Sequence, residues 1–197
     1  MSEIQQSVAN EAQTRPYVLK KTVVMVGMMG AGKTAVGRTL AQLLNVSFLD
    51  SDLEIEAAAN MSVPEIFARD GEAFFRARET EVIHRLLQDR KCVLSTGGGA
   101  FLSPENRANI SHSGVAVWLD AELELLWSRV RHRDTRPLLQ TADPKATLAE
   151  LYAKRVPEYA KADLRVSCAP PVSLENMAKR VASVLLTRPD VLEGPDA

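Results

Sequence analysis

The chain contains the stretch Gly27-Met28-Met29-Gly30-Ala31-Gly32-Lys33-Thr34, which fits the phosphate-binding loop pattern of Gly, any four residues, Gly, Lys and Ser or Thr. In that pattern the glycines let the backbone curl, so that successive N–H groups point at a polyphosphate. Lys33 is placed to reach the β- and γ-phosphates, and the Thr34 hydroxyl is placed to bind Mg²⁺. The stretch therefore predicts binding of a nucleoside triphosphate.

The residues on either side of this loop supply the structural context that the pattern needs. Residues 22–26 form an apolar, β-branched run typical of a buried parallel strand. After Lys33 the apolar residues recur on one helical face, and Asn45 offers a helix end. The N-terminus of such a helix itself attracts anions. A glycine-rich turn in an unrelated α/β protein is the alternative, and it explains this context less well.

Composition narrows the class of protein. The chain has 197 residues, of which 46% are hydrophobic, and this suits one compact domain. With 24 basic and 25 acidic residues the net charge is −1, so we expect neither a nucleic acid nor a membrane surface as partner. Cys92 and Cys168 lie in apolar runs, which indicates buried free thiols in a reducing compartment, and we expect a cytoplasmic protein.

The two ends of the chain read as tails. Residues 1–16 are polar and have no apolar centre, so we predict a flexible segment and no signal peptide. Residues 188–197 end in Pro, Gly and acidic residues, and we predict a second flexible tail. The folded domain is then expected at 17–187.

Five short apolar runs predict strands, and helical patterns separate them. This alternation predicts a three-layer α/β/α fold with a five-stranded parallel sheet, whose ligands gather at the carboxyl ends of the strands. Ser62 with Glu65 predicts a capping box, and Gly71 a helix stop. The predicted strands are Thr22–Val26, Val46–Leu49, Cys92–Thr96, Val115–Leu119 and Leu164–Cys168.

One segment, residues 131–143, has no clear element but carries several basic residues, among them Arg136. A solvated basic loop is one interpretation. Because the segment lies between two helices of a triphosphate-binding protein, we favour a mobile lid that carries arginine to the active site.

Asp50 and Asp52 follow the second predicted strand. Two acids one residue apart beside a phosphate loop could divide two roles, one holding the metal or its waters and the other accepting a proton from an attacking hydroxyl. The alternative is that Asp52 and Glu54 stabilise a helix N-terminus, and both interpretations can hold at once. Gly97-Gly98-Gly99 follows the third strand and predicts a close approach of some group to the backbone.

Together these motifs resemble the shikimate kinase family, and the match runs from about Val23 to Val184. The order of the motifs is far more specific than the phosphate loop alone. The pieces are Gly27–Thr34, Asp50-Ser51-Asp52, Phe75-Arg76 with Glu79, Gly97-Gly98-Gly99, Arg136-Pro137-Leu138-Leu139, and Arg155 with Pro157 and Tyr159.

The resemblance implies a P-loop NTPase fold and Mg²⁺-dependent transfer of the ATP γ-phosphate to the 3-hydroxyl of shikimate, in aromatic amino-acid biosynthesis. It implies that Lys33, Asp52 and Arg136 are catalytic, with Asp52 as base, and that Thr34 and Asp50 serve the metal, helped by Ser95. Arg76 and Arg155 would hold the substrate carboxylate, while Gly98 and Gly99 contact the ring. The implied ATP-binding residues are Gly30, Ala31, Gly32, Lys33, Thr34, Ala35, Arg129 (against adenine) and Arg136, and the loop Ala169-Pro170-Pro171 should border the base.

Two other classes compete with this interpretation. A related metabolite kinase such as a gluconate kinase shares the phosphate loop and lid, but should lack Arg76 and Arg155 paired with the triple glycine. A regulatory GTPase would carry Asp-x-x-Gly and Asn-Lys-x-Asp signatures, which this sequence lacks. We therefore expect a monomeric enzyme whose partners are ATP and shikimate.

Overall fold

The computed structural model describes residues 16–132, 137–170 and 172–195, and a five-stranded sheet of order β3-β4-β2-β5-β6 forms its centre. All neighbouring strands are parallel, which confirms the predicted sheet. At each end the observed strands differ from the predicted ones by at most one residue. The strands are β2 (Thr22–Val26), β3 (Ser47–Asp50), β4 (Cys92–Ser95), β5 (Gly114–Asp120) and β6 (Leu164–Ser167).

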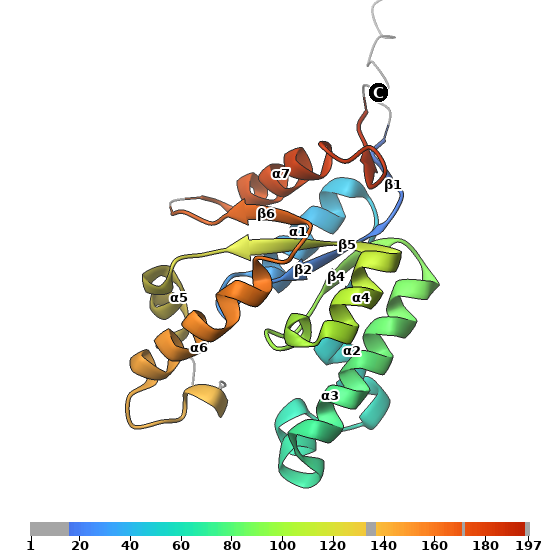
Figure 1. Cartoon of the computed structure of the whole chain (residues 1–197). Helices are drawn as coiled ribbons and strands as arrows, with labels where there is room; N and C mark the ends of the chain where they lie inside the picture. The colour runs from blue at the N-terminus through green and yellow to red at the C-terminus, as the bar shows by residue number, and fades with distance from the viewer. Residues whose placement is uncertain (1–15, 133–136, 171, 196–197) are drawn as a thin grey trace, which may run out of the picture.

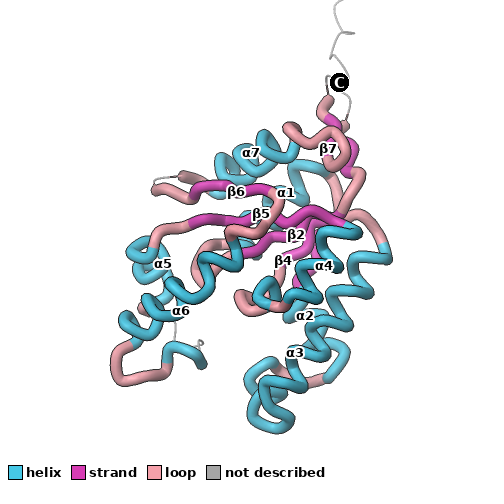
Figure 2. The backbone as a smooth tube through the Cα atoms, in the orientation of Figure 1, coloured by secondary structure: helices cyan, strands magenta, loops and turns pink. Residues whose placement is uncertain are grey.

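Helices cover both faces of this sheet, as Figures 1 and 2 show, so the predicted three-layer architecture is confirmed. Two helices, α1 (Lys33–Leu44) and α7 (Leu174–Leu185), pack together on one face. The other face carries α3 (Val63–Asp89), α4 (Pro104–Ser113) and α6 (Pro144–Tyr159). The shorter elements are α2 (Ser51–Ala59), α5 (Leu123–Val130), η1 (Ala100–Leu102) and η2 (Pro137–Leu139).

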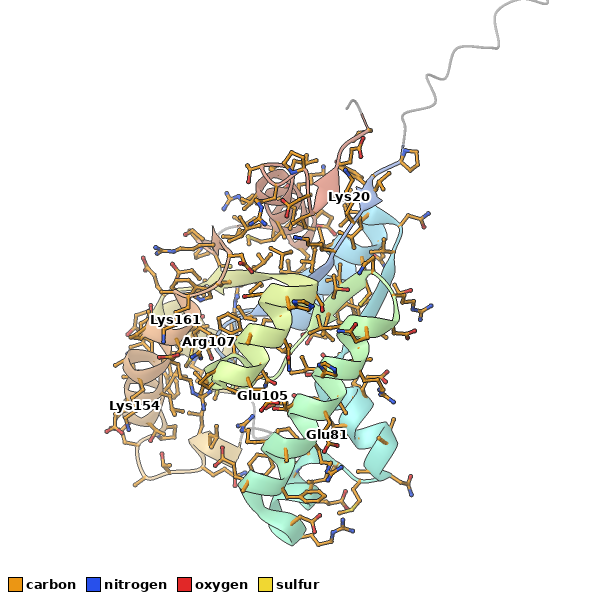
Figure 3. The ribbon with its side chains drawn as sticks, turned by 45° about the vertical axis from the view of Figure 1, so that its right-hand side comes forward. Lys20, Glu81, Glu105, Arg107, Lys154 and Lys161 are labelled. Carbon is orange, nitrogen blue, oxygen red and sulfur yellow. The ribbon has the colours of Figure 1, made fainter. Side chains whose placement is uncertain are left out.

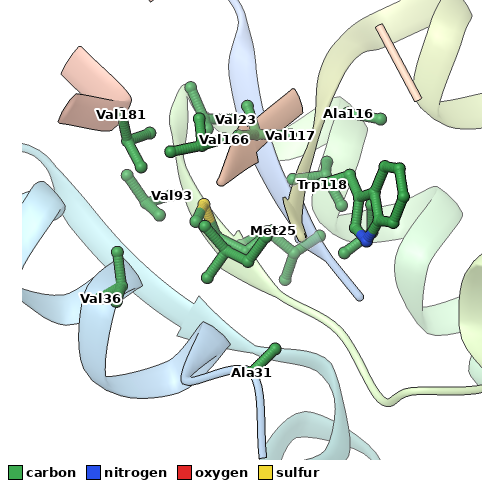
Figure 4. Close-up of a cluster of buried hydrophobic side chains, with 14 of the residues drawn as sticks. Val23, Met25, Ala31, Val36, Val93, Ala116, Val117, Trp118, Val166 and Val181 are labelled. Atoms are coloured by element: carbon green, nitrogen blue, oxygen red, sulfur yellow. The ribbon is translucent and has the colours of Figure 1, made fainter. Parts of the chain in front are cut away.

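The core lies on both sides of the strands. Figure 4 shows Val36 of α1 and Val181 of α7 beside the strand residue Val93, while Trp118 of β5 lies apart from this group. The Trp118 ring instead faces Tyr159 of α6, with the ring centroids 6.4 Å apart. Alternate strand residues thus supply opposite faces, and each large apolar side chain that is fully buried contributes roughly 1.5–3 kcal/mol.

Helix α3 begins and bends as its sequence predicts. Ser62 accepts a hydrogen bond from the backbone of Glu65, and the Glu65 carboxylate accepts one from the backbone of Ser62 at 2.8 Å. Gly71 interrupts the helix with φ 83° and ψ 171°, a conformation that favours glycine. The bend separates the first turns of α3 from the part that carries the site residues.

The C-terminal segment differs from the prediction. β7 (Leu192–Glu193) pairs antiparallel with β1 (Val18–Leu19), and Val191 and Leu192 are buried. The expectation of a loose tail from residue 188 is therefore wrong for residues 188–193. Two apolar residues within a Pro-, Gly- and acid-rich stretch give no periodic signal, so only their packing against the N-terminal strand reveals them. Residues 1–15 and 196–197 lie outside the described residues.

Three smaller structural features concern the cysteines, the predicted lid segment and the lengths of the helices. Cys92 and Cys168 are buried free thiols, as expected. Leu139, inside the segment predicted as a lid, is 8% exposed, so the described part of that segment has an apolar anchor. Within the described ranges, no helix has the length and apolar character needed to cross a membrane.

Candidate active site

A cleft of about 1060 Å³ lies at the carboxyl ends of the strands. The phosphate loop forms its floor, and its walls come from the ends of β3, β4 and β6 and from the start of α7. The sheet topology brings these segments together, since parallel strands place all their carboxyl ends at one edge.

The phosphate loop has the geometry that its sequence predicts. Gly30 and Gly32 adopt φ values of 81° and 95°, and α1 begins at Lys33 directly after them. The buried Lys33 ammonium donates to the carbonyls of Gly27 and Met28 at 2.8 and 2.9 Å. The loop therefore presents a helix N-terminus and a positive charge to the cleft, a combination suited to phosphate.

Three oxygen-bearing side chains meet beside this loop. The Thr34 hydroxyl donates to the Asp50 carboxylate at 3.1 Å and lies 3.3 Å from the Ser95 hydroxyl. Asp50 and Ser95 occupy paired positions on neighbouring strands. Among the described residues, no group of three or more His, Cys, Asp or Glu side chains forms a metal cage. A hydroxyl with one carboxylate fits Mg²⁺, which keeps waters and takes further oxygens from phosphates.

Asp52 differs sharply from Asp50 in its surroundings. Asp50 caps α2, its carboxylate accepting from the Asp52 backbone at 3.1 Å, whereas the Asp52 carboxylate has a buried oxygen, Oδ1, without a hydrogen-bond partner. Burial, together with the negative charge of Asp50, raises the Asp52 pKa to about 6, against the opposing charge of Lys33. A carboxylate with a pKa near neutrality suits a general base. Asp52 and Glu54 also lie in the first turn of α2, as the helix-stabilising interpretation of these acids predicts.

The three glycines after β4, the glycine turn Gly97–Gly99, make room for charged side chains. A Cβ at residue 97 would lie 2.9 Å from an Asp52 oxygen and 3.1 Å from a Glu79 oxygen. A Cβ at residue 99 would lie 2.5 Å from the Arg76 guanidinium, whereas one at residue 98 would keep 3.5 Å from Arg155. The predicted close approach is confirmed, and the approaching groups belong to the predicted site.

Glu79 has a role that the sequence did not assign. It accepts a hydrogen bond from Arg76 at 2.8 Å, and its side chain is 1% exposed. Burial raises the pKa of Glu79 to about 7, although the Arg76 charge and its hydrogen bond oppose this shift. Its position three residues after Arg76, on the same helical face, is the signal that identifies such a partner.

Arg155 and Tyr159 bring α6 to the same turn. Arg155 is 8% exposed, and the buried Tyr159 hydroxyl donates to the Gly98 carbonyl. Arg76 on α3 and Arg155 on α6 therefore lie against neighbouring glycines, and Asp52 lies beside the same turn. Arg136, the remaining predicted catalytic residue, lies outside the described residues.

The other end of the cleft is less polar. The Arg129 guanidinium donates to the carbonyls of Gly30 and Ala31 at 3.1 and 3.3 Å, which fixes it beside the phosphate loop. Ala169 and Pro170 line the cleft as expected, while Pro171 lies outside the described residues. The sequence did not identify the other lining residues here, because they follow the strand without a motif: Cys168, Val172, Ser173, Leu174 and Met177.

Comparisons with known proteins agree on one family. The family model described as shikimate kinase matches residues 29–186. The chain is 64% identical over 193 residues to a shikimate kinase of Ruegeria pomeroyi, covering 98% of this chain and 99% of the relative. It is 62% identical over 175 residues to a shikimate kinase of Cereibacter sphaeroides, covering 89% and 87%.

Solved structures give the same picture. A shikimate kinase from Acinetobacter baumannii in complex with shikimate is similar, with a TM-score of 0.80, 38% identity, and coverage of 85% of this chain and 93% of that one. A gluconokinase from Sinorhizobium meliloti has a TM-score of 0.58 and 18% identity, covering 86% and 93%. The second likeness concerns the fold alone.

Proposed function

Because this chain belongs to the shikimate kinase family and is therefore an ATP-dependent kinase acting on shikimate, we propose how its side chains share the transfer of the γ-phosphoryl group to the shikimate 3-hydroxyl. The single observation that carries this proposal is the convergence of Arg76, Arg155 and Asp52 on the glycine turn, next to the phosphate loop. The likeness to a gluconokinase carries no information about the acceptor, since many chemistries share one fold.

The phosphate loop and Arg129 bind ATP. Backbone N–H groups at Gly30–Ala35 and the Lys33 ammonium surround the phosphates, and Arg129, fixed by the loop carbonyls, borders the base. Thr34 and Asp50 would hold Mg²⁺, and the Ser95 hydroxyl, 3.3 Å from that of Thr34, would help to place its waters. When bound, Mg²⁺ supplies charge neutralisation to the phosphates.

Arg76 and Arg155 anchor the acceptor through its carboxylate. A planar guanidinium suits a carboxylate, and two of them from different helices fix its orientation. The ring contacts the backbone at Gly98 and Gly99, beside these guanidinium groups. The carboxylate thereby places the ring so that a hydroxyl faces Asp52.

Asp52 accepts the proton of the attacking hydroxyl. Its pKa of about 6 leaves it ionised at neutral pH, yet basic enough to take a proton as the oxygen attacks. Arg136 stabilises the charge on the transferring phosphoryl group from the lid at residues 131–143, which closes over the substrates and excludes water.

We also propose that the enzyme works as a monomer in the cytoplasm. Its small-molecule substrates need no partner chain, and the two buried free thiols suit a reducing compartment.

Conservative replacement of one anchor tests the proposed acceptor site. Arg155→Lys keeps the charge but loses the planar fork, so the KM for shikimate should rise at least tenfold while the KM for ATP changes less than twofold. Arg165→Lys is the matched control, since that arginine, 67% exposed on β6, pairs with Asp120 of β5 and should leave both constants unchanged. Equal KM values for shikimate in Arg155→Lys and the parent protein would reject the carboxylate anchor.

A further inference from the structure

We propose that Tyr159 and the Arg107–Glu158 ion pair are positioning residues, which fix the glycine turn and the η1 segment behind it relative to α6. This inference rests on the proposed place of shikimate between Arg155 and the glycine turn. None of the three side chains belongs to the phosphate loop or to the predicted set of substrate contacts.

Tyr159 holds the turn at its centre. Its side chain is fully buried, with the ring beside Trp118 and the hydroxyl donating to the Gly98 carbonyl. Burial raises the pKa of Tyr159, opposed by the charge of Arg155, so the hydroxyl keeps its proton and remains a donor. This hydrogen bond fixes the orientation of the Gly98 peptide, so α6 determines which side of that peptide faces the cleft.

Arg107 holds the segment that follows the turn. From α4 its Nη1 donates to the carbonyls of Phe101 and Leu102 at 2.8 and 2.9 Å, and it lies 2.8 Å from the Glu158 carboxylate. Arg107 is 17% exposed, so this ion pair is better shielded from water than the surface pairs of the molecule. Glu158 directly precedes Tyr159 in α6. Tyr159 contacts the start of the segment 98–102 at Gly98, and Glu158 contacts its end through Arg107.

Helix α6 therefore carries one guanidinium of the acceptor site and also sets the backbone opposite it. Arg155 is one helical turn before Tyr159, so both side chains reach the turn from the same face of α6. A movement of α6 would displace Arg155 and the glycine turn together, so the distance between them would stay constant. Tyr159 and the Arg107–Glu158 pair together form a clamp on the glycine turn and η1. Loss of this clamp should loosen the acceptor pocket and leave the ATP site, which lies on the phosphate loop, unchanged.

Lys161 supplies a matched control. It pairs with the same carboxylate, at 2.8 Å from Glu158, but is 52% exposed. In Figure 3 it lies near Arg107, at the end of α6. Its ammonium binds both oxygens of the Glu158 carboxylate, so Lys161→Met removes a Glu158 interaction and leaves the Arg107–Glu158 pair in place.

Steady-state kinetics of four variants of the full chain test the proposal. Tyr159→Phe removes one hydroxyl and keeps the ring, and Arg107→Met removes the charge. In each, the KM for shikimate should rise about 3–10-fold, the loss expected for one hydrogen bond, while the KM for ATP changes less than twofold. Arg107→Lys should recover part of the loss, and Lys161→Met should match the parent protein.

The outcomes separate this inference from the proposed acceptor site. An unchanged KM for shikimate in Tyr159→Phe and Arg107→Met, or equal rises in both KM values, would overturn the positioning role. If Arg155→Lys raises the KM for shikimate while Tyr159→Phe does not, only the clamp fails. If neither Arg155→Lys nor Tyr159→Phe changes the KM for shikimate, the proposed place of shikimate in the site is wrong.

Discussion

The guanidinium of Arg76 occupies the space that a side chain at Gly99 would need, because a Cβ there would lie 2.5 Å from Nη2. Gly99 has φ −91° and ψ −16°, a conformation open to any residue, so its role is spatial. The glycine permits an arginine on α3, held by the buried Glu79, to lie flat against the backbone after β4.

Gly99→Ala should displace Arg76 without unfolding the protein, because the conflicting atoms belong to the end of a long side chain. We expect the KM for shikimate to rise about tenfold or more, the effect of losing one charge-assisted contact, with the KM for ATP unchanged within twofold. Steady-state kinetics with each substrate varied would measure both constants.

A double-mutant cycle with Arg76→Ala shows whether the added methyl group acts through Arg76. If it does, Gly99→Ala should cost little once Arg76 is gone. Full additivity of the two losses would mean that the methyl group blocks the substrate directly.

Asp52→Asn should stabilise the protein at pH 8 while lowering its activity. The pKa of Asp52 is about 6 in the folded protein and 3.8 as the unperturbed value, so between these values the folded state binds more protons and stability falls as pH rises. The free-energy cost of holding an ionised Asp52 in the folded protein, about 1–3 kcal/mol, is fully present above pH 6. Thermal unfolding at pH 8 should therefore show a higher Tm for the variant, with little gain at pH 4.

Glu81→Gln is the control for this measurement, since Glu81 is 60% exposed on α3. Its Tm should stay close to that of the parent protein at both pH values. A Tm for Asp52→Asn below that of the parent at pH 8 would show that interactions of the buried carboxylate stabilise the fold by more than its unpartnered oxygen costs.

The metal site predicts a selective change in Mg²⁺ dependence. Asp50→Asn and Ser95→Ala should each raise the Mg²⁺ concentration for half-maximal activity about 10–100-fold, with KM for shikimate unchanged at saturating Mg²⁺. Thr39→Val is a suitable control, because that hydroxyl donates to the Ala35 carbonyl within α1. Identical Mg²⁺ titrations for all three variants would remove Asp50 and Ser95 from the metal site.

Arg136 should act in the transition state more than in nucleotide binding. Arg136→Ala is expected to lower kcat about 100-fold or more, while the Kd for ATP changes by no more than a few fold. Arg90→Ala, which removes an exposed arginine at the C-terminal end of α3, should leave kcat unchanged. A loss confined to ATP affinity in Arg136→Ala would place this residue in the binding site only.

The sequence predicts those parts of the molecule that depend on neighbouring residues. The phosphate loop, the strands and the capping box at Ser62 are local patterns, and all are confirmed. Strand order, the pairing of β1 with β7 and the contact of Tyr159 with Gly98 join residues far apart in the chain, so no local pattern contains them. The groups that approach the triple glycine, Arg76 and Asp52, also come from other elements, so the sequence predicts a close approach there but not which side chains make it.

ADP release measured with a panel of acceptors tests the central claim most directly. Shikimate should give saturable, ATP-dependent turnover, whereas gluconate should give none above background. Shikimate methyl ester, which lacks the negative charge that Arg76 and Arg155 would bind, should have a kcat/KM at least 100-fold lower, the loss of two charge-assisted contacts. Turnover with gluconate equal to that with shikimate, or an ester as effective as the free acid, would contradict the account.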